Sequence, residues 1–299
     1  MPRVTVVMAT YNWATVLPYS IGSVLDQTFT DFELLVIGDG CTDESGEVVA
    51  AIGDPRVQWH NLDTNTGHQT GPNNEGIRRA SGDVIAYLGH DDLWLPHHLQ
   101  VLLEAVDRGA RIAHAATLWV APDRRPAVWP HQAWIYERGT WITPTTLVHD
   151  RALAERVGGW RLPVDTGALA SEGELWQRMA AAWRRPRLVP RLTSVKLPAG
   201  LRRDVYRHRP NHEQETWLRR IRDADDPERS LLDAYGDRGA SSLGWQSESR
   251  RRLRTIRASL RVRTRLRRLG LYPPAPPTPP LASAEATLRR LRRFKGLDD

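Results

Sequence analysis

The first half of the chain alternates short apolar runs with amphipathic segments, and this alternation constrains the fold more than any other feature of the sequence. Short apolar runs are typical of strands buried on both faces, and helical spacing between them is typical of a parallel α/β sheet. The expected strands are Val4–Ala9, Phe32–Ile37, Val57–His60, Asp83–Leu88 and Ile112–Val120. The expected helices cover residues 16–25, 43–52, 74–80, 96–106, 150–157 and 172–183.

Polar residues follow three of the expected strands, after Thr10, after Ile37 and after Leu88. The carboxyl ends of parallel strands meet at one edge of a sheet, and open α/β sheets bind their ligands at that edge. Folding alone gives little reason for three such polar loops. The spacing therefore predicts a ligand site at this edge.

The composition is that of a globular protein with no candidate membrane span. Hydrophobic residues make up 40% of the 299 residues, and no apolar stretch reaches the roughly 18 residues that a span requires. Met1-Pro2-Arg3 leads directly into an apolar strand, without the pattern of a signal peptide. The single cysteine, Cys41, fits a reducing compartment. We therefore expect a cytoplasmic location.

The last third of the chain is rich in arginine, and the net charge is +7. A basic tract of this kind binds anionic lipid or nucleic acid, or is simply a solvated helix face. We expect peripheral contact with the inner face of a membrane, and we do not expect nucleic acid as a partner. The predicted organisation is a domain of residues 1–210, a helical extension of residues 211–299, a proline-rich linker at 273–280 and basic helices at 247–269 and 282–295.

Asp91-Asp92 is the sharpest chemical feature, because two adjacent carboxylates at a strand end repel each other and call for a cation or for hydrogen-bond donors. Mg²⁺ and Mn²⁺ are commonly held by one or two carboxylates together with substrate phosphates. Alternatively, Asp92 caps the helix that begins near Pro96. Asp39, between two glycines, either accepts an N–H from a base or forms a common Asp-Gly turn.

Taken in order, these segments resemble family 2 glycosyltransferases, which have the GT-A fold. The motifs that carry the resemblance are Val-Val-Met-Ala-Thr-Tyr-Asn (6–12), Val-Ile-Gly-Asp-Gly-Cys-Thr-Asp (36–43), Asn65-x-Gly67, Asn73-x-x-Gly76, Ala-Ser-Gly-Asp-Val-Ile-Ala-Tyr-Leu (80–88) and Gly-His-Asp-Asp-Leu-Trp (89–94). The resemblance covers roughly residues 3 to 210. It implies an α/β sheet with flanking helices and a donor nucleotide sugar.

The resemblance also implies roles for single residues. Nucleotide binding falls on Thr10, Tyr11, Asn12, Asp39, Asn65, Gly67 and Asn73, and metal binding (Mn²⁺ or Mg²⁺) falls on Asp91 and Asp92, with Asp91 as the main ligand. The late segment from Tyr206 to Asn211 suggests a diphosphate contact by Arg207 or His208, although a plain surface loop explains it equally well. Stacking on sugar rings is possible for Trp94, Trp141 and Trp160, although most tryptophans belong to the core.

Ser171-Glu172-Gly173-Glu174-Leu175-Trp176 takes the place of the acidic segment that holds the catalytic base in the family. Aligning Leu175-Trp176 assigns the base to Glu172, which would take the proton from the acceptor hydroxyl. The alternative is structural, because Ser171 and Glu174 have the spacing of a capping box.

The expected activity is an inverting transfer from a UDP- or dTDP-sugar to a glycan, a lipid-linked or a small-molecule acceptor, as in the synthesis of cell-envelope polysaccharides. Three departures from the family pattern matter: Gly38 and Gly89 replace acidic residues, and Pro72 stands where many relatives have an arginine. A noncatalytic relative that binds nucleotide sugar or glycan is therefore the main alternative. A membrane or nucleic-acid adaptor acting through the basic tail ranks last, since it leaves the ordered motifs unexplained.

Overall fold

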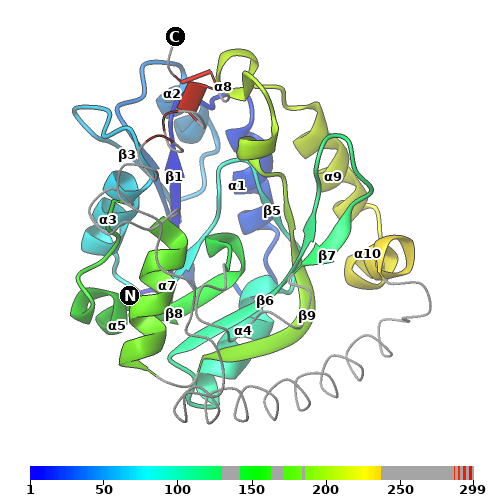
Figure 1. Ribbon diagram of the computed structural model, residues 1–299. Coiled ribbons are helices and arrows are strands. Elements are labelled where there is room, and N and C mark those ends of the chain that lie inside the picture. Colours follow the sequence, from blue (N-terminus) through cyan, green and yellow to red (C-terminus); the bar gives the residue numbers. More distant parts are fainter. Residues whose placement is uncertain are drawn as a thin grey trace, which may run out of the picture.

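Within the described residues, nine strands form one mixed β-sheet at the centre of the computed structural model, and helices pack on both faces of the sheet (Figure 1). The structure describes residues 1–129, 142–162, 171–183 and 186–236, together with residues 286, 289, 292, 293, 296 and 297. The expected helix at 247–269 and the linker at 273–280 lie outside these residues. Of the expected helix at 282–295, residues 286, 289, 292 and 293 are helical.

The elements of the first half follow the predicted alternation closely. The strands are β1 (Val4–Thr10), β2 (Phe32–Gly38), β3 (Val57–Asn61), β4 (Val84–Tyr87), β5 (Leu93–Trp94), β6 (Ile112–Trp119), β7 (Ala127–Trp129), β8 (Leu147–Asp150) and β9 (Arg187–Lys196). The α-helices are α1 (Leu17–Leu25), α2 (Ser45–Ala51), α3 (Thr70–Arg79), α4 (His98–Asp107), α5 (Arg151–Arg156), α7 (Ser171–Ala182), α8 (Val205–His208), α9 (His212–Arg222) and α10 (Pro227–Tyr235), and the short 3₁₀ helices are η1 (Pro144–Thr146) and η2 (Ala199–Leu201).

The order of the strands explains where a ligand can bind. The sheet runs β3-β2-β1-β4-β8-β6-β9-β5, with β7 beside β6. Strands β3, β2, β1 and β4 are parallel, and β8 joins β4 and β6 in antiparallel pairing. The chain leaves β1 towards β2 on one side and returns to β4 on the other, so the carboxyl end of β1 is a topological switch point.

Successive side chains of β1 enter two separate cores, because neighbouring residues of a strand point to opposite faces. Val4, Val6 and Met8 pack in the first core with residues of α1 and α4. Val7 packs in the second core with residues of α3, α5 and α7. Both faces of the strand are thus covered, which accounts for its mainly apolar sequence, in which Thr5 is the polar exception before Thr10.

Helices α9 and α10 lie at the right of Figure 1, where α9 packs next to β5 and α10 packs next to β9. Trp217, Leu218 and Ile221 of α9 share a third core with residues of β9 and β6. The first described part of the predicted extension therefore packs on the same sheet as residues 1–210. The division of the chain into a domain of residues 1–210 and an extension of residues 211–299 stays a prediction.

Helix α3 differs from its prediction, since it begins at Thr70 instead of Asn74. Pro72 lies in its first turn, where a missing N–H is tolerated because those N–H groups have no partner within the helix. Strand β9 was not predicted. It carries Arg187, Pro190 and Arg191, and its register with β6 shifts beside Pro190, which hides the strand pattern.

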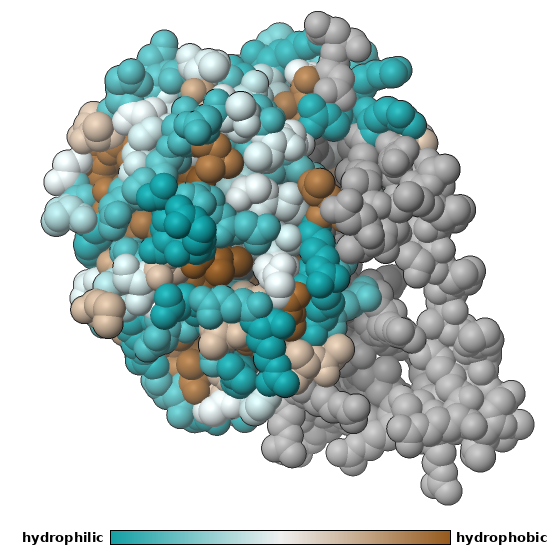
Figure 2. All heavy atoms as spheres, turned by 90° about the vertical axis from the view of Figure 1, so that its left-hand side faces the viewer, coloured by the Kyte–Doolittle hydropathy of each residue, from teal (hydrophilic) through white to brown (hydrophobic). Residues whose placement is uncertain are grey.

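The surface is mainly hydrophilic on the face shown in Figure 2, where hydrophobic residues form small separate groups. Among the described residues, the large hydrophobic side chains that stay exposed are Met1, Leu162 and Leu201. None of the helices in the described ranges combines the length and the apolarity that a membrane span needs.

Candidate functional site: a pocket at the switch point of the sheet

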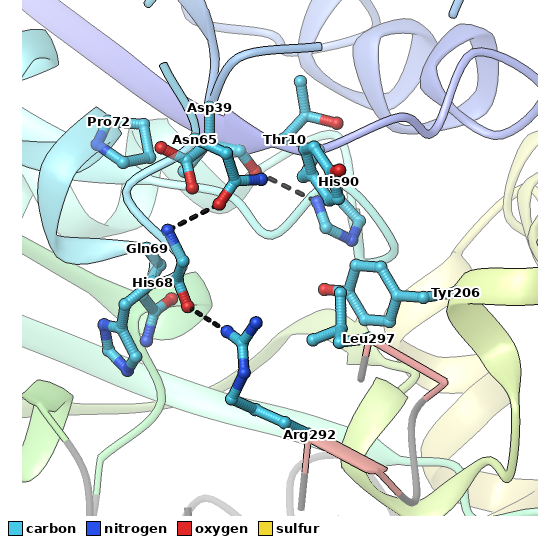
Figure 3. Close-up of a pocket in the computed structure, with 13 residues that line it drawn as sticks. Thr10, Asp39, Asn65, His68, Gln69, Pro72, His90, Tyr206, Arg292 and Leu297 are labelled. Carbon is cyan, nitrogen blue, oxygen red and sulfur yellow. Dashed lines mark hydrogen bonds between the residues drawn. The ribbon is translucent and has the colours of Figure 1, made fainter. Parts of the chain in front are cut away.

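A pocket opens at the carboxyl ends of β1, β2 and β4, as the polar loops predicted (Figure 3). Its walls come from seven parts of the chain: the end of β1, the end of β2, the loop before α3, the start of α3, the loop after β4, helix α8 and the C-terminal segment. The lining residues are Ala9, Thr10, Tyr11, Asp39, Asn65, Gly67, His68, Gln69, Pro72, His90, Tyr206, Arg292 and Leu297.

Asp39 is held in place at the end of β2 by the neighbouring loops. Its backbone N–H donates to Thr10 O at 2.8 Å, and its Oδ1 accepts from the N–H and the hydroxyl of Thr66 at 2.9 and 2.7 Å. The residue is only 5% exposed. Among the described residues no donor binds Oδ2, so this oxygen is available to accept an N–H group from a ligand in the pocket.

Thr10 supplies a buried hydroxyl that lacks a partner. The residue is 2% exposed, and its Oγ1 has no hydrogen-bond partner among the described residues. Leaving a buried polar group unpaired costs about 1–3 kcal/mol. Thr10 lines the pocket, but its hydroxyl is buried and does not open onto it (Figure 3).

The other predicted nucleotide contacts divide into lining and supporting residues. Tyr11, Asn65 and Gly67 line the pocket, and Asn65 Oδ1 accepts from Gly67 N at 2.6 Å. Asn12 lies outside the lining: its Oδ1 accepts from Thr42 N at 2.7 Å and so fixes the loop after β2. Asn73 is buried within α3 and is not a lining residue.

Asp91 and Asp92 occupy different environments although they are adjacent. Asp92 is fully buried: Oδ2 accepts from Lys196 Nζ at 2.7 Å and from the Thr145 hydroxyl, and Oδ1 accepts from Leu197 N at 3.0 Å. Burial raises the pKa of the Asp92 carboxyl, whereas the Lys196 ammonium group lowers it. With both oxygens engaged, Asp92 ties the loop after β4 to the end of β9 and is poorly placed as a metal ligand.

Asp91 is the better candidate for a metal ligand. Its Oδ2 accepts one hydrogen bond, from Ala199 N at 3.2 Å. No group of three or more metal-ligating side chains occurs among the described residues. One carboxylate fits Mg²⁺ or Mn²⁺ only if substrate phosphates supply further ligands, which is the usual arrangement for these ions. The residues present therefore fit a metal that arrives with a diphosphate.

The two glycines that depart from the family pattern have local structural explanations. A Cβ at Gly89 would lie 2.7 Å from Asp92 Oδ2 and 3.0 Å from Asp91 Oδ1, so the carboxylates already fill that space. A Cβ at Gly38 would lie 2.7 Å from the ring of Trp59 and would also meet Asn61 Oδ1. The Asn61 side chain in turn holds Cys41: its Oδ1 accepts from Cys41 N at 2.8 Å, and its Nδ2 donates to Cys41 O at 2.9 Å.

His90 forms part of an aromatic wall of the pocket. Its ring stacks on Trp13 with centroids 4.5 Å apart, and Nδ1 lies 3.1 Å from Ala9 O. Tyr206 meets both rings edge-on. Burial raises the pKa of Tyr206, with Asp91 and Asp39 adding to the effect and nearby arginines opposing it.

Tyr206 is the residue of α8 that lines the pocket, whereas the predicted contacts Arg207 and His208 are exposed and lie outside the lining. Sequence reasoning pointed to the basic residues of this segment. Helical geometry turns the preceding tyrosine inward instead, since adjacent residues of a helix face different directions.

Glu172 lies in the first turn of α7. Leu175 and Trp176, which anchor the family alignment, are buried in the second core. Glu174 forms an ion pair with Arg178 at 2.5 Å. The assignment of Glu172 as the catalytic base stays a prediction, because its side chain is outside the described part of the structure.

Two of the predicted sugar-stacking tryptophans belong to the core, so the prediction for them is corrected. Trp94 is 1% exposed, stacks on His98 and donates from Nε1 to Thr145 O at 2.8 Å. Trp160 is 3% exposed and donates from Nε1 to the Tyr87 hydroxyl at 3.1 Å. Neither ring presents a face to a sugar. Trp141 lies outside the described residues.

Solved structures with this arrangement of the sheet share the fold over nearly the whole chain. The S. aureus TarS 1–349 structure in complex with UDP-GlcNAc matches 98% of this chain and 90% of its own chain, with a TM-score of 0.58 and 16% identity. The mannosyltransferase PcManGT from Pyrobaculum calidifontis, in complex with GDP-Man and Mn²⁺, covers 99% and 82%, with a TM-score of 0.53 and 19% identity. The fold is that of the GT-A glycosyltransferases.

Residues 5–170, more than half of the chain, match the family described as Glycosyl transferase family 2. The chain belongs to this family. It is 41% identical over 114 residues to the succinoglycan biosynthesis protein ExoO of Rhizobium meliloti, covering 38% of this chain and 32% of that protein. It is 31% identical over 114 residues to the GalNAc(5)-diNAcBac-PP-undecaprenol beta-1,3-glucosyltransferase of Campylobacter jejuni, covering 36% of each. The matched stretches span about a third of the length of these curated relatives.

Proposed function

We propose that the chain is an inverting glycosyltransferase that moves a sugar from a nucleoside-diphosphate sugar to an acceptor hydroxyl. The observation that carries the proposal is the pocket at the switch point of the sheet. There Asp39 presents Oδ2, Thr10 and Tyr11 line the wall, and Asp91 lies in the loop after β4. These groups suit a nucleotide base, a polar ligand and a metal-bound diphosphate.

Each group has a distinct role in the proposed binding of the donor. Asp39 accepts an N–H of the base, and Thr10 and Tyr11 line the nucleotide. Asp91 would hold Mn²⁺ or Mg²⁺, and the ion would offset the negative charge on the departing diphosphate. UDP or dTDP suits an acceptor at Asp39, because uracil and thymine each carry an imide N–H.

The transfer itself requires a base on the acceptor side, and we assign it to Glu172. The carboxylate of Glu172 takes the proton from the acceptor hydroxyl while that oxygen bonds to the anomeric carbon. The bond between the anomeric carbon and the diphosphate oxygen breaks, and the nucleoside diphosphate leaves. Attack from the face opposite the leaving group inverts the configuration.

The names of relatives favour a lipid-linked acceptor. The Campylobacter jejuni relative is named for a diphosphoundecaprenol-linked glycan, and an Escherichia coli relative is named as a UDP-Glc:alpha-D-GlcNAc-diphosphoundecaprenol beta-1,3-glucosyltransferase. We extend this acceptor class to the present chain, at the cytoplasmic face of a membrane. Contact of the basic C-terminal segment with that membrane belongs to the same proposal.

Calorimetry with UDP, dTDP and GDP, with and without Mn²⁺, tests the donor site. We expect one nucleotide to bind in a metal-dependent manner, and Asp91→Asn to weaken it about tenfold to a hundredfold through loss of a charged ligand. Asn keeps an oxygen that can accept from Ala199 N, so the fold should persist. Asp63→Ala, at an exposed position, is the matched control. Absence of binding by the wild type would refute the proposed donor site.

A transfer assay separates an enzyme from a noncatalytic relative. UDP release from UDP-glucose is measured with a polyprenyl-diphosphate-linked N-acetylglucosamine as acceptor. Glu172→Gln should lower kcat by about a hundredfold or more while leaving UDP affinity unchanged. A wild-type protein that binds UDP but releases none from any donor tested would support the noncatalytic alternative.

A further inference from the structure

Two residues from the far end of the chain line the nucleotide pocket, although nothing in the sequence motifs points to them. Arg292 and Leu297 lie across the pocket from Asp39 and Asn65 (Figure 3). Arg292 Nη1 donates to Gly67 O at 2.6 Å. This bond links residues 225 positions apart and joins the C-terminal segment to the loop before α3.

A helix-terminating motif holds both residues in this place. Gly296 has a φ of +78°, Gly296 N donates to Arg293 O at 3.0 Å, and Leu297 N donates to Arg292 O at 3.0 Å. These are the two hydrogen bonds of a Schellman motif, which folds the residue after the glycine back over the last helical turn. Leu297 is thereby placed next to Arg292 on the same wall.

The segment also packs closely on α8, the element that supplies Tyr206. A Cβ at Gly296 would lie 2.9 Å from Arg207 Cγ and 3.3 Å from Asp204 Cα. Gly296 therefore meets two requirements, a positive φ and a close approach to α8. A segment without specific packing against α8 would need neither the positive φ nor the close approach.

The charges around the pocket give Arg292 a function. Among the lining residues that the structure describes, Arg292 is the one with a permanent positive charge, whereas Asp39 lies on the wall and Asp91 beside it. The charges of Asp91, Asp39, Arg209 and Arg292 all act on the Tyr206 hydroxyl, and of the two arginines it is Arg292 that lines the pocket. A diphosphate entering such a site meets repulsion from the carboxylates unless cations offset it.

We propose that Arg292 is a donor-binding residue that contacts the diphosphate, so that the C-terminal segment forms one wall of the donor site. The proposal rests on the function proposed above and adds a residue and an element to its binding site. A guanidinium presents five N–H donors in a planar fork that matches phosphate oxygens in pairs. In this arrangement Leu297 covers the pocket beside the arginine and limits the access of water.

The test compares Arg292→Ala with Arg293→Ala, which removes the same charge from the neighbouring, exposed position. UDP, GDP, uridine and guanosine are titrated into each full-length protein with Mn²⁺ present. Arg292→Ala should weaken the nucleoside diphosphate about tenfold to a hundredfold, as expected for hydrogen bonds to a charged group. It should leave the nucleoside affinity within about twofold, and Arg293→Ala should match the wild type in both.

Other results overturn the proposal in different ways. Unchanged diphosphate affinity in Arg292→Ala would show that the arginine does not bind the diphosphate. Tighter diphosphate binding in that variant would show that the segment blocks the pocket instead of completing it. Equal losses in Arg292→Ala and Arg293→Ala would indicate only a general effect of charge. If the wild type binds none of the four probes, the donor site itself fails, which is a separate outcome from failure of the role of Arg292.

Discussion

Lowering the pH from 7 to 5 should destabilise the fold through two histidines buried in the sheet. Burial lowers the pKa of His114 to about 3 and that of His149 to about 4, against about 6.5 in an unfolded chain. Below pH 6.5 the unfolded state therefore binds protons that the folded state does not, and stability falls as the pH falls. At 1.36 kcal/mol per pH unit, each histidine costs about 2 kcal/mol at pH 5.

The substitution His114→Leu isolates one of these contributions. Both ring nitrogens of His114 are buried without a hydrogen-bond partner among the described residues, so an apolar side chain of similar size should fit without loss at pH 7. Urea unfolding of the wild type and the variant is followed at both pH values. The variant should lose about 2 kcal/mol less than the wild type between pH 7 and pH 5.

The control is His212→Leu at an exposed position of α9, which should lose as much stability on acidification as the wild type. An equal loss in the wild type and in His114→Leu would refute the reasoning, because it would mean that the buried imidazole does not titrate differently in the two states.

Three further substitutions test other contacts by thermal or urea unfolding. Asp92→Asn should cost about 3–5 kcal/mol, since it removes the buried carboxylate charge that pairs with the Lys196 ammonium group, and a loss below about 1 kcal/mol would contradict that role. Gly76→Ala should destabilise by about 1–3 kcal/mol, because the clash of the new Cβ with Val7 should cost more than the roughly 1 kcal/mol gained in helix propensity. A more stable variant would show that α3 can move away from β1. Asp226→Ala should cost about 1 kcal/mol by removing the acceptor of Arg229 N at the start of α10, and an unchanged midpoint would mean that water replaces this cap.

Within the parallel part of the sheet, β1, β2 and β4 could be predicted because they are buried on both faces, whereas β3 is a partly exposed edge strand. Strands β1, β2 and β4 have mainly apolar sequences, interrupted by Thr5 and Glu33, that end at the polar residues of the pocket. Their common direction brings Thr10, Asp39 and His90 to one edge. Local sequence was sufficient there because the strand and the ligand loop are adjacent in the chain.

The rest of the site depended on geometry that local sequence does not carry. The family motif named Asp91 as the main metal ligand, but it could not show that Asp92 is engaged by Lys196, which lies on a strand more than a hundred residues away. It also could not show which way a tryptophan points, and Trp94 faces the core. Arg292 reaches the pocket across a long stretch of chain, and only the fold brings it there.

The crowding at Gly38 has a consequence for how this family can vary. The ring of Trp59 and the amide of Asn61 occupy the volume that a side chain at position 38 would need. An acidic residue at 38 and a tryptophan at 59 should therefore exclude each other among related chains, so that the two positions change together. In an alignment, this would appear as covariation between the end of β2 and the middle of β3. Gly38 with Trp59, and an acidic residue at 38 without a tryptophan at 59, would then be two alternative packings of β2 against β3. The two residues of each packing would be inherited together.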